Sequence, residues 1–143
     1  MNNNTQKVLD HLEMNIKTKI APSPIHGIGV FAIKDIKKGE QIFTPWDGDT
    51  GVYIIPNERY KSMSEAIRQQ LDMYFINEEC GFKLLRLFKG INFICHTVSY
   101  CNSAYPNEEN TNISNEGVAL RDISEGEEIL EWYTANIDLE NKK

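Results

Sequence analysis

The sequence is short of the residues that build metal sites. It has three cysteines, Cys80, Cys95 and Cys101, and three histidines among 143 residues. No Cys-x-x-Cys pair occurs and no histidine stands at a ligand spacing from a cysteine, so no metal site is expected. An odd number of widely spaced thiols, with no apolar signal-like segment near Met1, favours an intracellular location, either cytoplasmic or nuclear.

The sequence also lacks an excess of basic residues and any long apolar run. Fifteen Lys and Arg stand against 21 Asp and Glu, which gives a net charge of -6. Clustered cations are needed to neutralise phosphates, so direct nucleic-acid binding is not expected. No run approaches the roughly 20 apolar residues that span a bilayer, so no membrane partner is expected either. The acidic charge suits a basic partner such as a Lys-rich protein tail, but mild acidity is also common among soluble proteins.

What the sequence does contain is the pattern of one small domain. At 143 residues, 41% of them apolar, it is large enough for a core. We expect a loose leader over residues 1–15, the domain over 16–134 and a polar tail over 135–143. Short apolar or alternating runs predict strands over 16–20, 30–33, 41–44, 52–55, 118–120 and 128–133, and a strand or extended lead-in over 91–95.

One segment has a different period. Met63, Ile67 and Leu71 recur about every four residues, which predicts an amphipathic helix within 58–79. Either of two serines, at 62 or 64, would cap its start, and the glycine at 81 would follow its end. The next run, 82–88, fits a strand or a short helix. The whole pattern predicts an α+β fold that is mostly β.

Two motifs in a fixed order carry the strongest signal. The first reads His-Gly-Ile-Gly over 26–29, with Asp-Ile-x-x-Gly-Glu over 35–40. The second joins a polar loop over 100–107, an Ala-Leu-Arg-Asp-Ile strand over 119–123 and an acidic turn and strand over 125–133 that ends in Trp-Tyr. The pair resembles the SET domain of protein-lysine methyltransferases, and the ending is similar to the PR subgroup. Two motifs in order are far more specific than a lone Gly-x-Gly.

The resemblance implies a fold, an activity and a set of site residues. The fold would consist of short strands in small sheets, with a helical insert and a C-terminal pseudoknot. The activity would be methyl transfer from S-adenosyl-L-methionine to a lysine of a basic protein segment, commonly a histone, and a homodimer is compatible with it. The implied roles are catalysis by Tyr133, cofactor binding by His26, Gly27, Ile28, Gly29, Asn102 and Ser103, and a substrate channel walled by Trp46, Tyr100 and Trp132.

Physical chemistry agrees with several of these roles. Gly27 and Gly29 lack a Cβ, so a ligand could approach their backbone closely, although a tight turn between strands would use the same glycines. A lysine amine, with a pKa of about 10.4, must lose its proton before it attacks a methyl group. A dry aromatic channel disfavours the ammonium, and the Tyr133 hydroxyl could orient the amine. Trp46 and Tyr100 could hold a cation against their ring faces.

Several alternatives stay open. An alignment that keeps Pro106 in register would put Cys101, not Asn102, at the cofactor position, although an amide hydrogen-bonds far better than a thiol. The acidic residues over 125–131 could attract a basic peptide or form a solvated turn. Four departures from the family pattern allow a catalytically weak or inactive interaction module instead. They are Ser99, Ser103, a polar loop one residue shorter than the family's, and the lack of the flanking zinc-binding cysteines that many members have. A methyltransferase acting on a non-protein amine is a third possibility.

Overall fold

The computed structural model describes residues 3–48, 51–74, 76–87 and 97–132. The chain forms two compact units, each built from two separate segments. The first unit contains Met1–Ile16 and Thr44–His96, and the second contains Lys17–Phe43 and Thr97–Lys143. No helix within the described ranges is long and apolar enough to cross a membrane.

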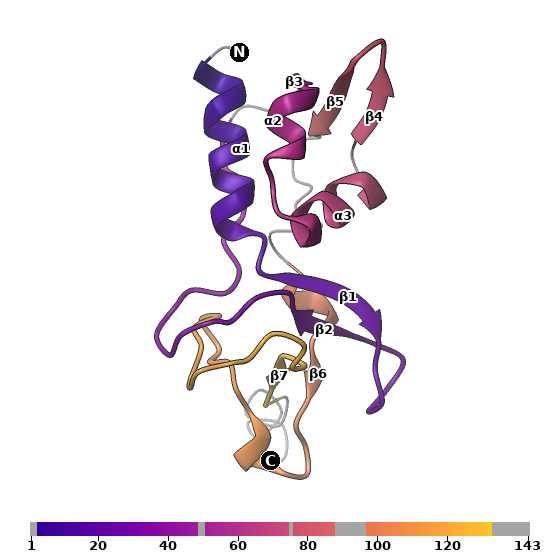
Figure 1. Cartoon of the computed structure of the whole chain (residues 1–143). Helices are drawn as coiled ribbons and strands as arrows, with labels where there is room; N and C mark the ends of the chain where they lie inside the picture. Colours follow the sequence, from indigo (N-terminus) through magenta and orange to yellow (C-terminus); the bar gives the residue numbers. More distant parts are fainter. Residues whose placement is uncertain (1–2, 49–50, 75, 88–96, 133–143) are drawn as a thin grey trace. The chain divides into compact units, whose positions relative to one another are not determined.

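The first unit combines helices with a three-stranded antiparallel sheet (Figure 1). Its helices are α1 (Asn3–Asn15), α2 (Asn57–Lys61) and α3 (Glu65–Tyr74). Its strands, in the sheet order β3-β5-β4, are β3 (Gly51–Pro56), β4 (Ile76–Glu79) and β5 (Phe82–Leu87). Tyr53 and Ile55 are buried while Val52 and Ile54 are exposed, which is the alternation of a sheet covered on one face.

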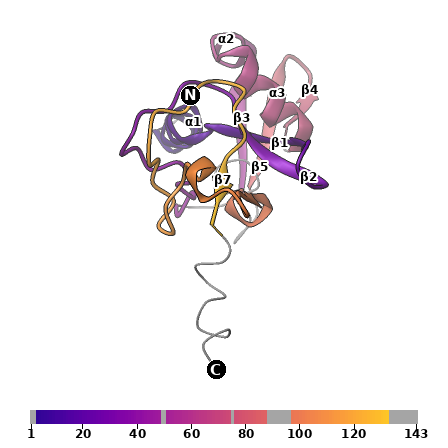
Figure 2. The same ribbon diagram turned by 90° about the horizontal axis from the view of Figure 1, so that it is seen from below.

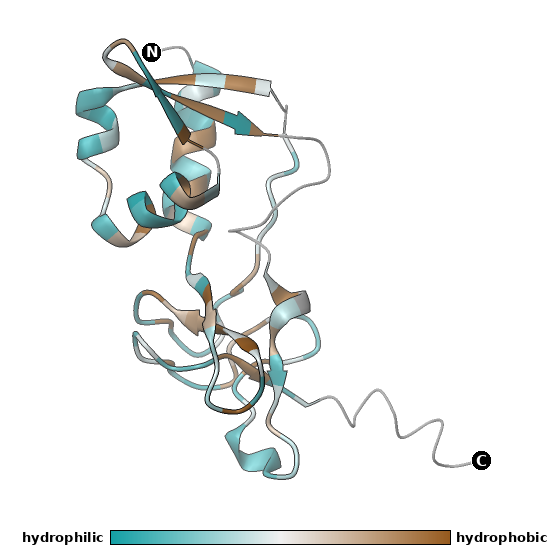
Figure 3. Cartoon of the chain, turned by 90° about the vertical axis from the view of Figure 1, so that its right-hand side faces the viewer, coloured by the Kyte–Doolittle hydropathy of each residue, from teal (hydrophilic) through white to brown (hydrophobic). Residues whose placement is uncertain are grey.

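The expectation of a loose leader over residues 1–15 is wrong for residues 3–15, because these residues form helix α1. Thr5, Val8, Leu9 and Leu12 are buried along one side of it, and Figure 3 shows hydrophobic and hydrophilic stretches along the helices of this unit. A polar, Asn-rich segment has little helix propensity of its own. Burial of one apolar stripe is therefore what stabilises this helix.

The single helix expected within 58–79 is also wrong. The segment forms α2, α3 and strand β4, with a break at Ser62-Met63-Ser64. The Ser64 Oγ accepts a hydrogen bond from the Ile67 backbone N–H at 3.3 Å, so Ser64 is the serine that caps α3. Gly81 ends no helix; it turns the β4–β5 hairpin at a φ of 88°.

Replacing Ser64 with alanine is expected to lower the free energy of unfolding by about 1 kcal/mol, since the cap hydrogen bond to Ile67 is lost. Urea titration followed by circular dichroism measures this change. Ser124→Ala, at an exposed serine of the second unit, is the matched control and should change stability by less than about 0.5 kcal/mol. Equal stability of the two variants would show that the cap contributes nothing.

The second unit is built from a hairpin, a parallel strand pair and extended segments. Strands β1 (Thr18–Pro22) and β2 (Ile28–Ala32) pair antiparallel and lie side by side in Figures 1 and 2. Strands β6 (Asn102–Ser103) and β7 (Leu130–Glu131) pair parallel, with Asn102 opposite Leu130. The remaining elements are the 3-10 helices η1 (Val98–Tyr100) and η2 (Glu108–Asn110).

Two of the expected strands in this unit are single bridges. Gln41 bridges Val118 and Ile113 bridges Ala119, so neither 41–44 nor 118–120 forms a ladder. Backbone hydrogen bonds from Ile42 N to Gly117 O, at 2.8 Å, and from Ala119 N to Glu40 O, at 2.9 Å, hold these segments instead. Their apolar side chains still enter one core, formed by Val30, Ala32, Ile36, Ile42, Phe43, Cys101, Ile113, Ala119, Ile123 and Ile129.

The predicted fold class is confirmed. Small sheets of short strands dominate, with few helices, and the run over 82–88 that fitted either structure contains strand β5. The parallel β6–β7 pair brings strand β7 beside the polar loop of the second motif. The lead-in expected over 91–95 and the tail expected over 135–143 lie outside the described residues.

Candidate functional site

The loop between β1 and β2 carries the first motif and is shaped by Ser23. The Ser23 N–H donates to Gly27 O at 2.8 Å, and its Oγ accepts from the Ile25 N–H at 3.0 Å and the His26 N–H at 3.4 Å. Gly27 has a φ of 47°, in the left-handed region that favours glycine, and nothing lies within 4 Å of where its Cβ would be. The loop is thus a folded turn with open space at Gly27.

Asn102, in the second motif, closes this loop from strand β6. It is 8% exposed, and its Nδ2 lies 3.0 Å from His26 O, 3.0 Å from Ile28 O and 2.9 Å from Glu128 Oε2. All three neighbours are acceptors, so only the amide nitrogen fits this position. The two motifs, 76 positions apart between His26 and Asn102, are therefore joined by direct hydrogen bonds.

Glu128 completes what we call the polar hub: Ser23, Asn102, Glu128 and the carbonyls of His26 and Ile28. The Ser23 Oγ lies 2.9 Å from both carboxylate oxygens of Glu128 and donates its proton to them. The carboxylate thus lies between the loop on one side and Asn102 on the other. One acidic side chain connects segments that are 105 positions apart between Ser23 and Glu128.

Because Gly29 has no Cβ, side chains of the polar hub can occupy the space beside it. A Cβ on Gly29 would lie 3.0 Å from Glu128 Cδ and 3.1 Å from Asn102 Nδ2, with Glu128 Oε2 nearer still. Such contacts are closer than real Cβ atoms tolerate without a shift of their neighbours. The missing Cβ at Gly29 therefore admits two side chains of this chain, whereas the missing Cβ at Gly27 faces open space.

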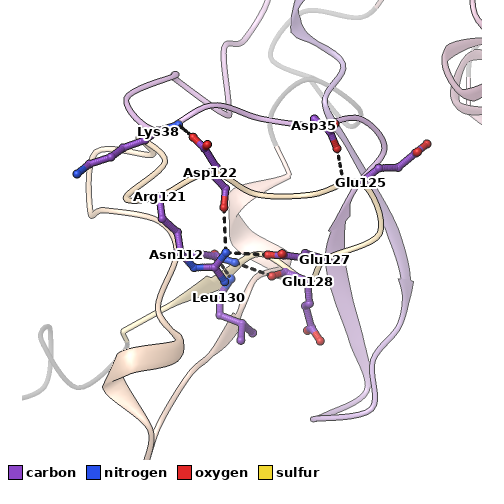
Figure 4. Close-up of polar contacts among 9 residues, drawn as sticks. All are labelled: Asp35, Lys38, Asn112, Arg121, Asp122, Glu125, Glu127, Glu128 and Leu130. Atoms are coloured by element: carbon purple, nitrogen blue, oxygen red, sulfur yellow. Dashed lines mark hydrogen bonds and ion pairs between the residues drawn. The ribbon is translucent and has the colours of Figure 1, made fainter.

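Asn112 fixes the backbone on which Glu128 stands (Figure 4). It is 1% exposed; its Nδ2 donates to Glu128 O at 2.8 Å and its Oδ1 accepts from the Leu130 N–H at 2.8 Å. The Asn112 N–H also donates to Leu130 O at 3.1 Å. Because three of its hydrogen bonds are made to the short segment 128–130, Asn112 fixes the backbone position from which the Glu128 side chain extends.

The acidic residues over 125–131 fall into distinct environments. Glu125 is exposed, and its backbone N–H, not its carboxylate, donates to Asp35 Oδ1 at 2.9 Å (Figure 4). Glu127 pairs with Arg121 at 2.9 Å in a partly exposed ion pair of small energetic value. Burial raises the pKa of Glu131. The expected cluster is thus partly a solvated turn and partly, through Glu128, a component of the hub.

Cys101, the alternative to Asn102, has a different environment. It is 1% exposed and belongs to the core of the second unit. Burial, together with the charges of Glu131 and Glu128, raises the pKa of its thiol far above the ordinary range. A neutral buried thiol is a poor nucleophile and a weak hydrogen-bonding group. The geometry brings Asn102, not Cys101, to the loop of the first motif.

The remaining predicted residues of this unit lie around strands β6 and β7. The Ser103 Oγ accepts from the Tyr105 N–H at 3.1 Å. Trp132 is partly buried, and its ring centroid is 5.9 Å from that of Tyr105 at an interplanar angle of 42°. Tyr100 is 41% exposed at the end of η1. Their channel role stays a prediction.

Trp46 and Tyr133 are the two remaining predicted site residues. Trp46 belongs to the first unit, where its ring centroid lies 5.2 Å from that of His11 in an edge-on contact. There it lines a pocket of about 220 Å³ with Asn4, Lys7, Gly48 and Tyr53. Tyr133 lies outside the described residues. The roles expected for both stay predictions.

Sequence reasoning missed three residues of this site: Ser23, Asn112 and the specific part played by Glu128. Glu128 was one of several acidic residues in a run, and Ser23 and Asn112 stand in polar loops with no distinguishing pattern. The only available signal was the position of Glu128 directly before the apolar pair that leads into β7. That signal does not show which partners the Glu128 side chain contacts.

A loop with two glycines, joined through a buried Asn to the strand before a Trp-Tyr pair, matches a known family. The family model of the SET domain matches residues 27–134, and the chain belongs to this family. None of the curated proteins searched matches the chain.

Two solved structures are similar to the chain. The methyltransferase domain of human PR domain-containing protein 2 is 22% identical over 86% of this chain and 82% of that one, with a TM-score of 0.40. A Plasmodium falciparum protein provisionally named as a histone methyltransferase is 25% identical over 82% of this chain and 92% of that one, with a TM-score of 0.33. At these TM-scores, neither likeness supports a conclusion about this chain.

Proposed function

We propose that this chain is an S-adenosyl-L-methionine-dependent protein-lysine N-methyltransferase that acts on a basic, Lys-containing protein segment, with histones as the first substrates to test. Membership of the SET domain family supports the reaction type. The observation that carries the proposal is the joining of His26, Ile28 and Asn102 by hydrogen bonds, because it unites both halves of the family's cofactor motif in one place.

The residues present fit such a cofactor. Within the described residues, no hydrogen bond reaches Asn102 Oδ1, which leaves an acceptor for a donor of the ligand, such as the ammonium of an amino-acid head. Open space at Gly27 leaves room for close approach to the backbone. In this proposal Asn102 and the loop over 26–29 hold the cofactor, and Ser103 contributes through its backbone. When bound, the cofactor supplies the activated methyl group.

The chain's own residues would prepare the lysine. We assign Tyr133 the role of orienting the neutral amine for in-line attack, since positioning of this kind can supply a large part of a rate enhancement. Trp132 and Tyr100 would exclude water and favour the uncharged amine. The net charge of -6 would help to attract a basic segment.

The test of the proposal is a cofactor titration followed by a transfer assay. Calorimetric titration of S-adenosyl-L-methionine into the wild type should show micromolar binding, about -8 kcal/mol. Asn102→Ala should weaken this binding by about tenfold or more, while Asn110→Ala, at an exposed Asn, should leave it unchanged. Wild-type protein should then label histones from methyl-labelled cofactor, and Tyr133→Phe should lower that rate by at least about 100-fold.

Each contrary outcome has a definite meaning. Absence of cofactor binding by folded wild-type protein would contradict the proposal and favour a protein-interaction module. Binding without labelling of any protein, but with labelling of small amines, would favour a non-protein substrate. Full activity of Tyr133→Phe would overturn the role given to that residue and leave the reaction type in place.

A further inference from the structure

We infer that Glu128 is a positioning residue for the cofactor: its carboxylate holds Asn102 and the loop over 23–29 in the arrangement that binds ligand. This inference rests on the proposed function and extends it to a residue outside the predicted site. It begins from the two hydrogen-bond donors that meet at one carboxylate, Ser23 Oγ and Asn102 Nδ2, each 2.9 Å away.

The contact with Asn102 orients the amide. The Nδ2 carries two hydrogens and faces three acceptors, of which the Glu128 carboxylate is the charged one and makes the shortest contact. This environment keeps the nitrogen toward the loop, so Oδ1 is the atom left for a ligand. If Glu128 were removed, one N–H of Asn102 would lose its charged partner, and the amide would be less firmly held.

The contact with Ser23 fixes the loop itself. Besides donating to Glu128, the Ser23 oxygen accepts from the backbone of Ile25 and His26, so its position determines the turn that leads to Gly27. The two carbonyls that Asn102 binds, those of His26 and Ile28, belong to the same loop. Glu128 therefore acts on the site from both sides, through Ser23 and through Asn102.

A carboxylate is the group this position requires. Two donors converge on it, and a carboxylate offers two oxygens that only accept, whereas a Gln side chain offers one acceptor and one donor. None of the ion pairs among the described residues includes Glu128; Arg121 pairs with Glu127 instead. Neutral donors thus surround its charge, and a nearby cationic group of a ligand would interact favourably with it.

A double-mutant cycle on cofactor affinity tests this inference. Calorimetry with S-adenosyl-L-methionine would compare the wild type with Glu128→Ala, Asn102→Ala and the double variant. We expect Kd to rise about tenfold or more in each single variant. Because Glu128 acts partly through Asn102, Glu128→Ala should weaken binding by a smaller factor in the Asn102→Ala background than in the wild type. A merely structural contribution would not produce this coupling.

Glu125→Ala, which removes an exposed carboxylate from the same turn, should leave Kd within about twofold of the wild type. If Glu128→Ala does not fold, as judged by thermal unfolding, Glu128→Gln replaces it in the cycle. If the two single effects on Kd simply multiply in the double variant, or if Glu128→Ala binds with wild-type affinity, the role given to Glu128 is wrong. The proposed function would still stand in either case. A wild type that binds no cofactor would overturn the proposed function.

Discussion

Replacing Asn112 with alanine is expected to lower the free energy of unfolding by about 3 kcal/mol. The change removes two 2.8 Å hydrogen bonds, one to Glu128 O and one from the Leu130 N–H. Because Asn112 is 1% exposed, water cannot readily replace them, and each buried group left without its partner costs about 1–3 kcal/mol. Chemical denaturation gives the difference directly.

Two further variants separate lost hydrogen bonds from lost volume. Asn110→Ala, at an exposed Asn of η2, should change stability by less than about 0.5 kcal/mol. Asn112→Asp keeps an acceptor for Leu130 but turns a carboxylate oxygen toward Glu128 O, which raises the pKa of that carboxyl in the folded state. Its deficit relative to the wild type should therefore shrink as pH falls toward 4, because the protonated carboxyl can donate. A pH-independent deficit equal to that of Asn112→Ala would contradict this account.

Gly29→Ala is expected to disturb the polar hub directly. Its Cβ would meet Glu128 Cδ at 3.0 Å and Asn102 Nδ2 at 3.1 Å, so both side chains must move. We expect a loss of about 1–3 kcal/mol in the free energy of unfolding. We also expect an increase of at least about tenfold in the Kd for S-adenosyl-L-methionine. Denaturant titration and calorimetry measure the two effects.

A double variant tests whether the clash with Glu128 causes the loss of stability in Gly29→Ala. In the double variant with Glu128→Ala, the nearest obstacle to the new Cβ is gone, so the stability loss should be smaller than the sum of the two single losses. Lys19→Ala, at an exposed position of β1, is the control and should leave stability and binding unchanged. A strictly additive double variant would show that Gly29 is needed for some reason other than the space that Glu128 fills.

The strands with clear alternation or apolar runs could be predicted from the sequence. The pattern over 52–55 predicted β3, and the apolar run over 30–33 predicted most of β2. Regions that depend on distant partners were predicted less well. Residues 41–44 and 118–120 have strand-like side chains, but each makes only an isolated bridge, because pairing is decided by where the partner segment lies.

The two wrong predictions about helices, over 1–15 and over 58–79, have the same cause. Helix α1 has a polar sequence and forms because Val8, Leu9 and Leu12 become buried, which local propensity cannot show. The segment over 58–79 has a helical period, but the chain stops α2 at Lys61 and restarts at Glu65 after the Ser64 cap. A period shows which side chains share a face and does not show that one helix is continuous.

The sequence by itself determined the family motifs, their order, the mostly β class and the identity of Asn102 and the two glycines as site candidates. These follow from local residue types and spacings. Only the tertiary structure decided that Glu128, rather than its acidic neighbours, reaches Asn102, and that the space beside Gly29 is filled from within. Ser23 and Glu128 are 105 positions apart, so their contact depends on how separate segments pack, and no local pattern specifies that.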